Sequence, residues 1–242
     1  MQNSVERPLA RLNLNEINNS LTEVEKNWPD IEKQLEEAEV DAREYPFTEL
    51  IRLRMMFAYE YLDYLLSIQE EPFANDEVER MLFINQRVLY GMDLKLIRER
   101  KGAIELNAER YYQQRKPLAN WYNNHKRYAK RRNNLKLPGQ VYVSTLREPQ
   151  LFLEGNHRSG SIIASWVSIY HGEAPFILSP ENAVAYFQPS REIEGFDNLM
   201  LKRGRKGLPK YNKSFMTFWK NNIDPKYLLV DAKGLEPLAS SV

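Results

Sequence analysis

The segment FLEGNHRSGSIIASWVSIYHGEAPFILSPENAVAYF, residues 152–187, decides the fold of this chain. Within it, a polar turn between Gly155 and Gly160 leads directly into residues 162–169, which are apolar almost all round. Because a helix at the surface keeps one polar side, such a run is typical of a helix in the centre of a protein. We therefore expect a buried helix that begins near Asn156, directly behind a polar loop.

Helical spacing also dominates the sequence outside this segment. Apolar residues recur every three or four positions in 17–38 and 81–97, and a last amphipathic helix surrounds 215–219. Residues 48–70 predict a second central, nearly buried helix. Its expected buried face consists of Leu50, Leu53, Phe57, Tyr61, Tyr64, Leu65 and Ile68.

One stretch between the helices has a different character. Pro138-Gly139 predicts a turn, and Val141, Tyr142 and Val143 are residues that favour strands. The sequence therefore predicts an all-α fold with a small β-hairpin near 139–147.

Composition excludes several classes of site. The chain of 242 residues has no cysteine, which excludes disulfides, thiol catalysis and zinc–thiolate centres. Its three histidines leave little for a histidine-built metal site. A net charge of +1 gives no global support to nucleic-acid binding. No apolar run reaches the roughly 18 residues that a membrane helix needs, so we expect no membrane association and a cytoplasmic location.

The polar loop has the features of an anion site. The first backbone N–H groups of a helix have no partner within the helix, and the helix dipole adds partial positive charge there. Arg158 adds a full charge and a bidentate fork, and Glu154 could hold a divalent cation against phosphates. We expect residues 154–158, with Ser159 and Gly160 behind them, to bind phosphate or another anion.

The same residues also fit an ordinary helix start. In that case Asn156 or Ser159 is the capping residue, and Arg158 and Glu154 form an ion pair at the surface. The pattern alone does not separate the two interpretations.

The loop resembles the signature of the Fic/Doc (Fido) family, H-x-F-x-[D/E]-G-N-[G/K]-R-x-x-R. Phe152 matches its buried aromatic residue, Glu154 its magnesium-coordinating acid, and Arg158 its phosphate-binding arginine. Gly155 and Asn156 match its anion nest. The resemblance implies a nucleotide ligand such as ATP with Mg²⁺, and the transfer of a nucleotide monophosphate, commonly AMP, to protein hydroxyls.

The residues after the loop extend this resemblance. A glycine–proline turn at 172–175 and a proline-capped helix with the aromatic pair Tyr186 and Phe187 follow the apolar helix, as in the family. The clear similarity covers residues 150 to about 190. It implies a Fic-like core at 75–195, between an N-terminal helical region at 1–74 and a C-terminal loop and helical cap at 196–242.

Three positions depart from the signature. Gln150 stands at the place of the catalytic histidine, His157 at the place of a glycine or lysine, and Ser161 at the place of the second arginine. The family's histidine is the general base, and a glutamine amide cannot accept a proton at physiological pH. His157 could serve as the base in place of the missing histidine. Its position in the loop, however, directs it at the phosphate site and not obviously at an incoming hydroxyl.

These departures leave open whether the chain is an enzyme. The first expectation is a degenerate Fic protein that binds a nucleotide or another phosphate, with weak or altered transfer. The alternative is a non-enzymatic regulatory or protein-interaction module built on the Fic fold. DNA binding through the basic runs at 126–136 and 202–210 is a third and weaker option.

Overall fold

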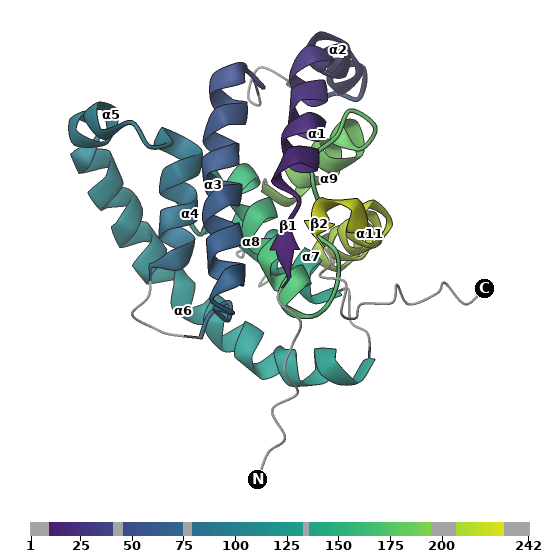
Figure 1. Cartoon of the computed structure of the whole chain (residues 1–242). Coiled ribbons are helices and arrows are strands. Elements are labelled where there is room, and N and C mark those ends of the chain that lie inside the picture. Colours follow the sequence, from purple (N-terminus) through teal and green to yellow (C-terminus); the bar gives the residue numbers. More distant parts are fainter. Residues whose placement is uncertain (1–9, 41–45, 75–78, 133–135, 195–206, 230–242) are drawn as a thin grey trace.

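The computed structural model describes residues 10–40, 46–74, 79–132, 136–194 and 207–229. These residues are mostly helical, with one two-stranded antiparallel sheet, which confirms the prediction of an all-α fold with a small β element (Figure 1). The helices are α1 (Leu14–Lys26), α2 (Trp28–Glu37), α3 (Glu49–Ser67), α4 (Arg80–Tyr90), α5 (Leu94–Glu99), α6 (Lys101–Arg132), α7 (Lys136–Leu146), α8 (Asn156–Tyr170), α9 (Ala183–Glu194), α11 (Gly207–Asn222) and the 3₁₀ turn η2 (Pro225–Tyr227).

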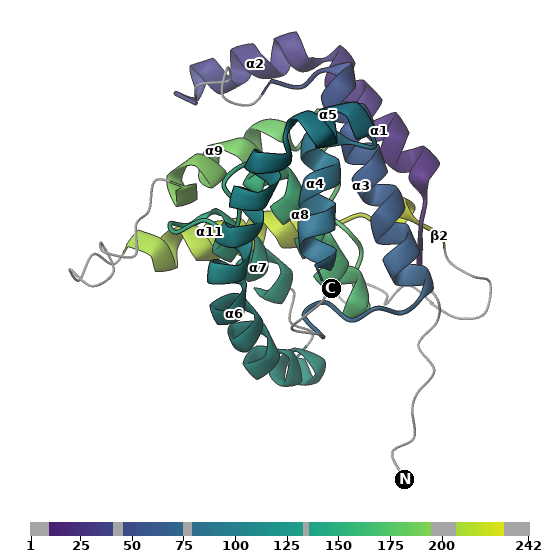
Figure 2. The same cartoon turned by 90° about the vertical axis from the view of Figure 1, so that its left-hand side faces the viewer.

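Helix α8 is the centre of the fold, as the sequence predicts. It begins at Asn156, and twelve of its fifteen residues are buried. Figures 1 and 2 show it enclosed by α3, α4 and α7. The helix ends at Tyr170 with His171 as its C-cap, and Gly172 follows with a φ of 85°, a left-handed conformation that favours glycine. The loop in front of α8 is thus attached directly to a buried helix.

The β-hairpin predicted near 139–147 is wrong, because this stretch belongs to α7. Val141, Tyr142 and Val143 prefer strands, but α7 is buried between α8 and α11. Burial of a helix on several sides outweighs the intrinsic preferences of its residues, which differ by less than about 1 kcal/mol each. Pro138 is tolerated because it lies in the first turn, where its missing N–H has no helical partner.

The small sheet lies at the two ends of the described chain. Strand β1 (Arg11–Leu12) pairs with β2 (Leu228–Leu229), so that Leu12 faces Leu228 in the register. Asp63 of α3 fastens this sheet to the core: it accepts a hydrogen bond of 2.8 Å from the backbone N–H of Leu12 and is paired with the guanidinium of Arg11.

The buried face predicted for α3 is mostly wrong. Leu50, Leu53, Tyr64 and Ile68 are among the exposed large apolar residues, and only Leu65 of the predicted set is fully buried. The residues that α3 turns towards the core are Met55, Ala58, Tyr59, Leu62, Asp63, Leu65 and Leu66. Since α3 is apolar on nearly every side, periodicity could not distinguish its inner face from its outer face.

Candidate functional site

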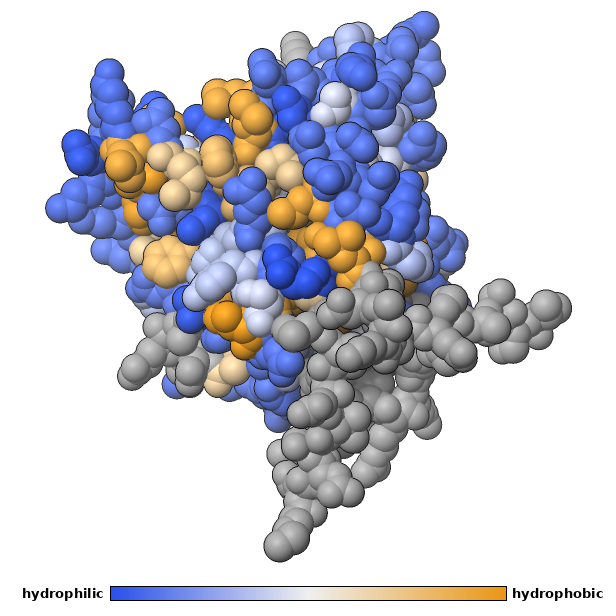
Figure 3. Space-filling view, in the orientation of Figure 1, coloured by the Kyte–Doolittle hydropathy of each residue, from blue (hydrophilic) through white to orange (hydrophobic). Residues whose placement is uncertain are grey.

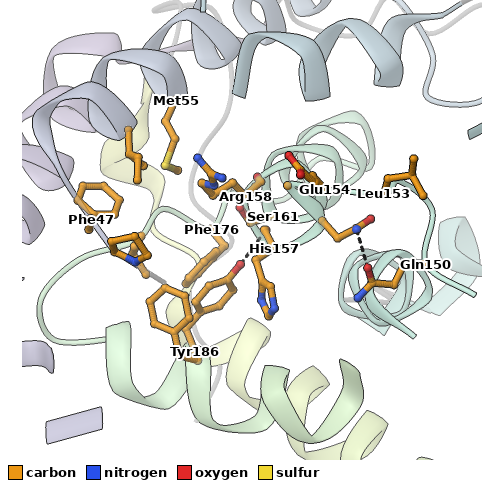
Figure 4. Close-up of a pocket in the computed structure, with 16 residues that line it drawn as sticks. Phe47, Met55, Gln150, Leu153, Glu154, His157, Arg158, Ser161, Phe176 and Tyr186 are labelled. Atoms are coloured by element: carbon orange, nitrogen blue, oxygen red, sulfur yellow. Dashed lines mark hydrogen bonds between the residues drawn. The ribbon is translucent and has the colours of Figure 1, made fainter. Parts of the chain in front are cut away.

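A pocket of about 410 Å³ opens at the N-terminus of α8 (Figure 4). Its polar side is built by Gln150, by residues 154–158 and by Ser161, which includes most of the predicted anion loop. Its apolar side is built by Phe47, Ile51, Met55, Phe176, Leu178, Tyr186 and Phe187, with Pro46 and Leu153 at its edge. The volume is within the range of about 300–1,000 Å³ that small-molecule sites usually have.

Gly155 makes the turn into α8 possible. It is the N-cap residue, with a φ of 75° in the left-handed region. A Cβ atom there would lie 3.0 Å from Nδ2 of Asn85 and 3.1 Å from Cδ2 of Leu89. Both the backbone conformation and the close contact therefore require glycine. As glycine has no side chain, it brings no capping acceptor to the first-turn amide groups of α8.

Asn156 holds the loop together. Its Oδ1 accepts a hydrogen bond of 2.9 Å from the N–H of Phe152, and its Nδ2 donates to the carbonyl of Phe152 and to Oε1 of Gln150, at 2.8 and 2.9 Å. Asn156 is therefore a loop-closing residue and not the capping residue of the ordinary-helix interpretation. Gln150 uses its carbonyl oxygen in this contact, so the other polar group of its side chain is an N–H donor.

Two asparagines hold the loop from outside. Asn107 of α6 accepts from the N–H of Leu153 at 2.8 Å and donates to Oδ1 of Asn85 at 2.6 Å. Asn85 of α4 then donates to the carbonyl of Glu154 at 2.8 Å. Both side chains are buried. Neither contact was predicted from the sequence, although Asn85, a polar residue on the apolar face formed by 81–89, was a usable signal.

Arg158 lies half-buried in the pocket, and Figure 4 shows its guanidinium nitrogens on the side of Met55. Its Nη1 makes a long contact of 3.5 Å with the carbonyl of Val88. Among the described residues, no carboxylate lies within ion-pair distance of it, so the surface pair with Glu154 does not form. Burial lowers the pKa of Arg158, and the like charge of Arg54 lowers it further, while Glu154 opposes these effects.

His157 and Ser161 line the pocket, but both make polar contacts with other groups of the protein. Nδ1 of His157 lies 3.2 Å from the hydroxyl of Tyr142, and the carbonyl of His157 accepts a hydrogen bond of 2.8 Å from Tyr186. The hydroxyl of Ser161 donates to the carbonyl of Arg158 at 2.9 Å. Ser161 therefore closes the first turn of α8, and its hydroxyl is a poor substitute for a charged phosphate clamp.

Ser159 and Gly160 do not line the pocket, although the sequence predicted both to contact the anion. The Oγ atom of Ser159 accepts from Nδ2 of Asn85 at 2.9 Å, which places this side chain in the core. A Cβ atom on Gly160 would lie 2.4 Å from Oγ1 of Thr145 in α7. These two residues dock α8 against its neighbours.

Comparisons with protein-family models, with curated proteins and with solved structures find no match for this chain. The resemblance of residues 150–190 to the Fic family therefore stays a prediction.

The apolar side of the pocket comes mainly from two distant parts of the chain, residues 46–55 and residues 176–187. Trp28 of α2 packs against Phe47 and Phe187, with ring centroids 5.7 and 5.9 Å away. Tyr186 stacks on Phe176 at 5.2 Å. The contact of Phe47 and the first turn of α3 with the loop was not predicted, because no local pattern marks a contact between segments about a hundred residues apart.

Glu154 is the one carboxylate that the described residues contribute to the pocket lining, and it is exposed. Groups of three or more potential metal ligands are absent from the described part of the chain. Mg²⁺ usually keeps several waters and binds one or two carboxylates together with substrate phosphates. Glu154 fits the part of a single protein ligand to a phosphate-bound cation, but it does not fit a self-sufficient metal site.

Three other titratable residues, Glu148, His125 and His171, lie outside the pocket. Glu148 is exposed and does not line the pocket, His125 stacks on Trp121, and His171 contacts the hydroxyl of Tyr122 at 3.1 Å.

Residues 133–135 and 202–206 of the two basic runs lie outside the described part of the chain. None of the described helices is long and apolar enough to cross a membrane.

Proposed function

We propose that this protein binds a nucleotide or another phosphate anion at residues 154–158, as a divergent Fic-type protein with weak or altered nucleotidyl transfer. The observation that carries the proposal is the half-buried guanidinium of Arg158, which reaches the pocket at the N-terminus of α8 without a carboxylate partner among the described residues. A charge taken out of water without a partner costs free energy. An anionic ligand would offset this cost.

The composition of the pocket supports a ligand with two different parts. Arg158 and the amide groups at the start of α8 favour a phosphate at one side. Phe47, Tyr186 and Phe187 offer an aromatic wall that suits a flat base. Glu154, at the exposed edge, would be the protein ligand of a Mg²⁺ ion that neutralises further phosphate oxygens.

The same residues argue against efficient catalysis. Gln150 cannot accept a proton, and its carbonyl oxygen already bonds to Asn156. Loss of a positioned general base typically lowers the rate by about 10²–10⁴-fold. The hydroxyl of Ser161 is turned to the backbone, so one positive group of the family's phosphate site is missing.

A thermal-shift titration with ATP and Mg²⁺ tests the proposal. We expect the ligand to raise the Tm of the wild-type protein and to leave the Tm of Arg158→Ala unchanged, because the main phosphate contact is lost. Arg147→Ala is the matched control: Arg147 is also half-buried, and burial lowers its pKa, but it does not line the pocket. A wild-type protein that does not respond, or an Arg158→Ala variant that responds equally, would refute nucleotide binding here.

A second candidate function is a non-enzymatic interaction module. It is favoured by the exposed apolar side chains of α3 and its C-cap, which are Leu50, Leu53, Tyr64 and the C-cap residue Ile68. Figure 3 shows apolar residues gathered on the face of the molecule where α3 lies. The variant Gln150→His discriminates the two functions. If it gains nucleotide-dependent self-modification, detected by mass spectrometry, the cleft is preserved for chemistry; if it gains none, the interaction module is favoured.

A further inference from the structure

Two arginines from different helices converge on the last turn of α4. Arg158 of α8 approaches the carbonyl of Val88 with its Nη1. Arg54 of α3 lies against Gly91, since a Cβ atom built on that glycine would be 3.3 Å from Cγ of Arg54. Both side chains are half-buried. The C-terminal end of α4, with its partial negative charge, offers only a weak counter-charge to the two guanidinium groups.

Arg54 is placed next to the pocket by the helix that carries it. Ile51 and Met55, on the same side of α3, both line the pocket, and Arg54 lies one turn after Ile51, on the flank of this side. Its charge is felt at Arg158, whose pKa it lowers. Arg54 does not itself line the pocket, so it would act on a ligand through the local potential and through Arg158.

Another arginine of α3, in contrast, has a carboxylate partner. Arg52 donates to Glu25 at 2.7 Å and to Oδ1 of Asn18 at 2.8 Å. Arg54, two residues further on, has no carboxylate within ion-pair distance among the described residues. A half-buried pair of like charges lowers the stability of the protein alone, a pattern that is common at functional sites.

We propose that Arg158 forms a subsite for a dianionic phosphate monoester, and that the neighbouring Arg54 supplies, through the local potential, the second positive charge that Ser161 cannot supply. This inference rests on the proposed phosphate binding and goes further by assigning the charge of the ligand. Glu154 does not cancel the pair, because it is exposed and its charge is screened by water. A carboxylate or a phosphodiester, each with a single charge, would leave the pair partly uncompensated.

Two probes that share base and sugar but differ in charge test the proposal. At about pH 8, AMP is a phosphate monoester with two charges, whereas 3′,5′-cyclic AMP is a diester with one. We expect calorimetry to show that the wild-type protein prefers AMP. Arg54→Gln should weaken AMP binding roughly tenfold, the effect of one unit charge at a partly buried site, and cyclic AMP binding much less. Arg54→Lys should keep most of the AMP affinity.

Arg52→Gln is the matched control on the same helix, and it should lower the Tm while leaving both affinities unchanged. Arg54→Gln should instead keep or raise the Tm of the protein alone, since it relieves repulsion. The inference is overturned if Arg54→Gln binds AMP as tightly as the wild type, or if it loses AMP and cyclic AMP to the same extent. If the wild type binds neither AMP nor cyclic AMP but still responds to ATP and Mg²⁺ in the thermal-shift titration, this inference fails and the proposed function stands. If it responds to none of the three, the proposed function itself fails.

Discussion

Gly160 of α8 packs closely against α7. The sequence predicted that Gly160 contacts the anion, but it does not line the pocket, and its missing side chain instead leaves room for Thr145. Gly155, five residues earlier, is required for its left-handed backbone conformation. Two glycines of one loop are thus constrained for different reasons, one by conformation and the other mainly by packing.

Gly160→Ala should destabilise the protein by about 1–3 kcal/mol, because its Cβ atom would overlap the side chain of Thr145 in a packed interface. Chemical denaturation measures this change. Gly102→Ala is the control: it lies in α6 with nothing within 4 Å of the added atom. That variant should be neutral or more stable by up to about 1 kcal/mol, owing to the better helix propensity of alanine. Equal stability of Gly160→Ala and the wild type would contradict this packing.

At the scale of elements, the pocket loop is held by hydrogen bonds from helices on either side. Asn107 of α6 and Asn85 of α4 bond to the backbone of Leu153 and Glu154, and Asn156 of α8 closes the loop from within. The loop is therefore shaped before any ligand arrives, which reduces the entropy lost on binding. Its geometry depends on the mutual placement of three helices.

Asn107→Ala should lower the free energy of unfolding by about 1–3 kcal/mol, because it leaves the N–H of Leu153 and Oδ1 of Asn85 without their partner. Hydrogen exchange at the Leu153 amide should become faster, and the ATP response should weaken. Asn124→Ala, an exposed position on the same helix, should change stability by no more than about 0.5 kcal/mol. Unchanged exchange at Leu153 would show that Asn107 does not hold the loop.

At the scale of the whole molecule, one hydrophobic core joins all three predicted segments. It includes Ile17 and Phe47 from residues 1–74, Phe152 and Trp166 from 75–195, and Trp219 from 196–242. The sheet between β1 and β2 connects the beginning of the described chain with its end. The first and last segments therefore contribute to the same folding unit as the predicted Fic-like core.

A fragment of residues 75–195 should fail to fold alone, since it would expose α8 where α3 covers it and would lose the apolar wall at Phe47. Circular dichroism and the dispersion of amide resonances would report this directly. The full chain under the same conditions should unfold in a single cooperative transition. A fragment with native-like dispersion and ATP binding would instead support an independent core domain.

The sequence by itself determined the helical class, the central position of α8 and the start of that helix behind a polar loop. These features depend on local chemistry: a run that is apolar all round must be buried, and a glycine before a helix marks its boundary. The loop residues 154–158 followed from the same argument, and they do line one pocket.

Only the tertiary structure decided the rest. Val141, Tyr142 and Val143 lie in a helix because burial in α7 outweighs their preference for strands, and Leu50 and Leu53 are exposed because the opposite side of α3 meets the core. The pocket wall at Phe47, the support from Asn107 and the approach of Arg54 to Arg158 join residues that are distant along the chain. Such contacts depend on how the helices pack, which local periodicity does not encode.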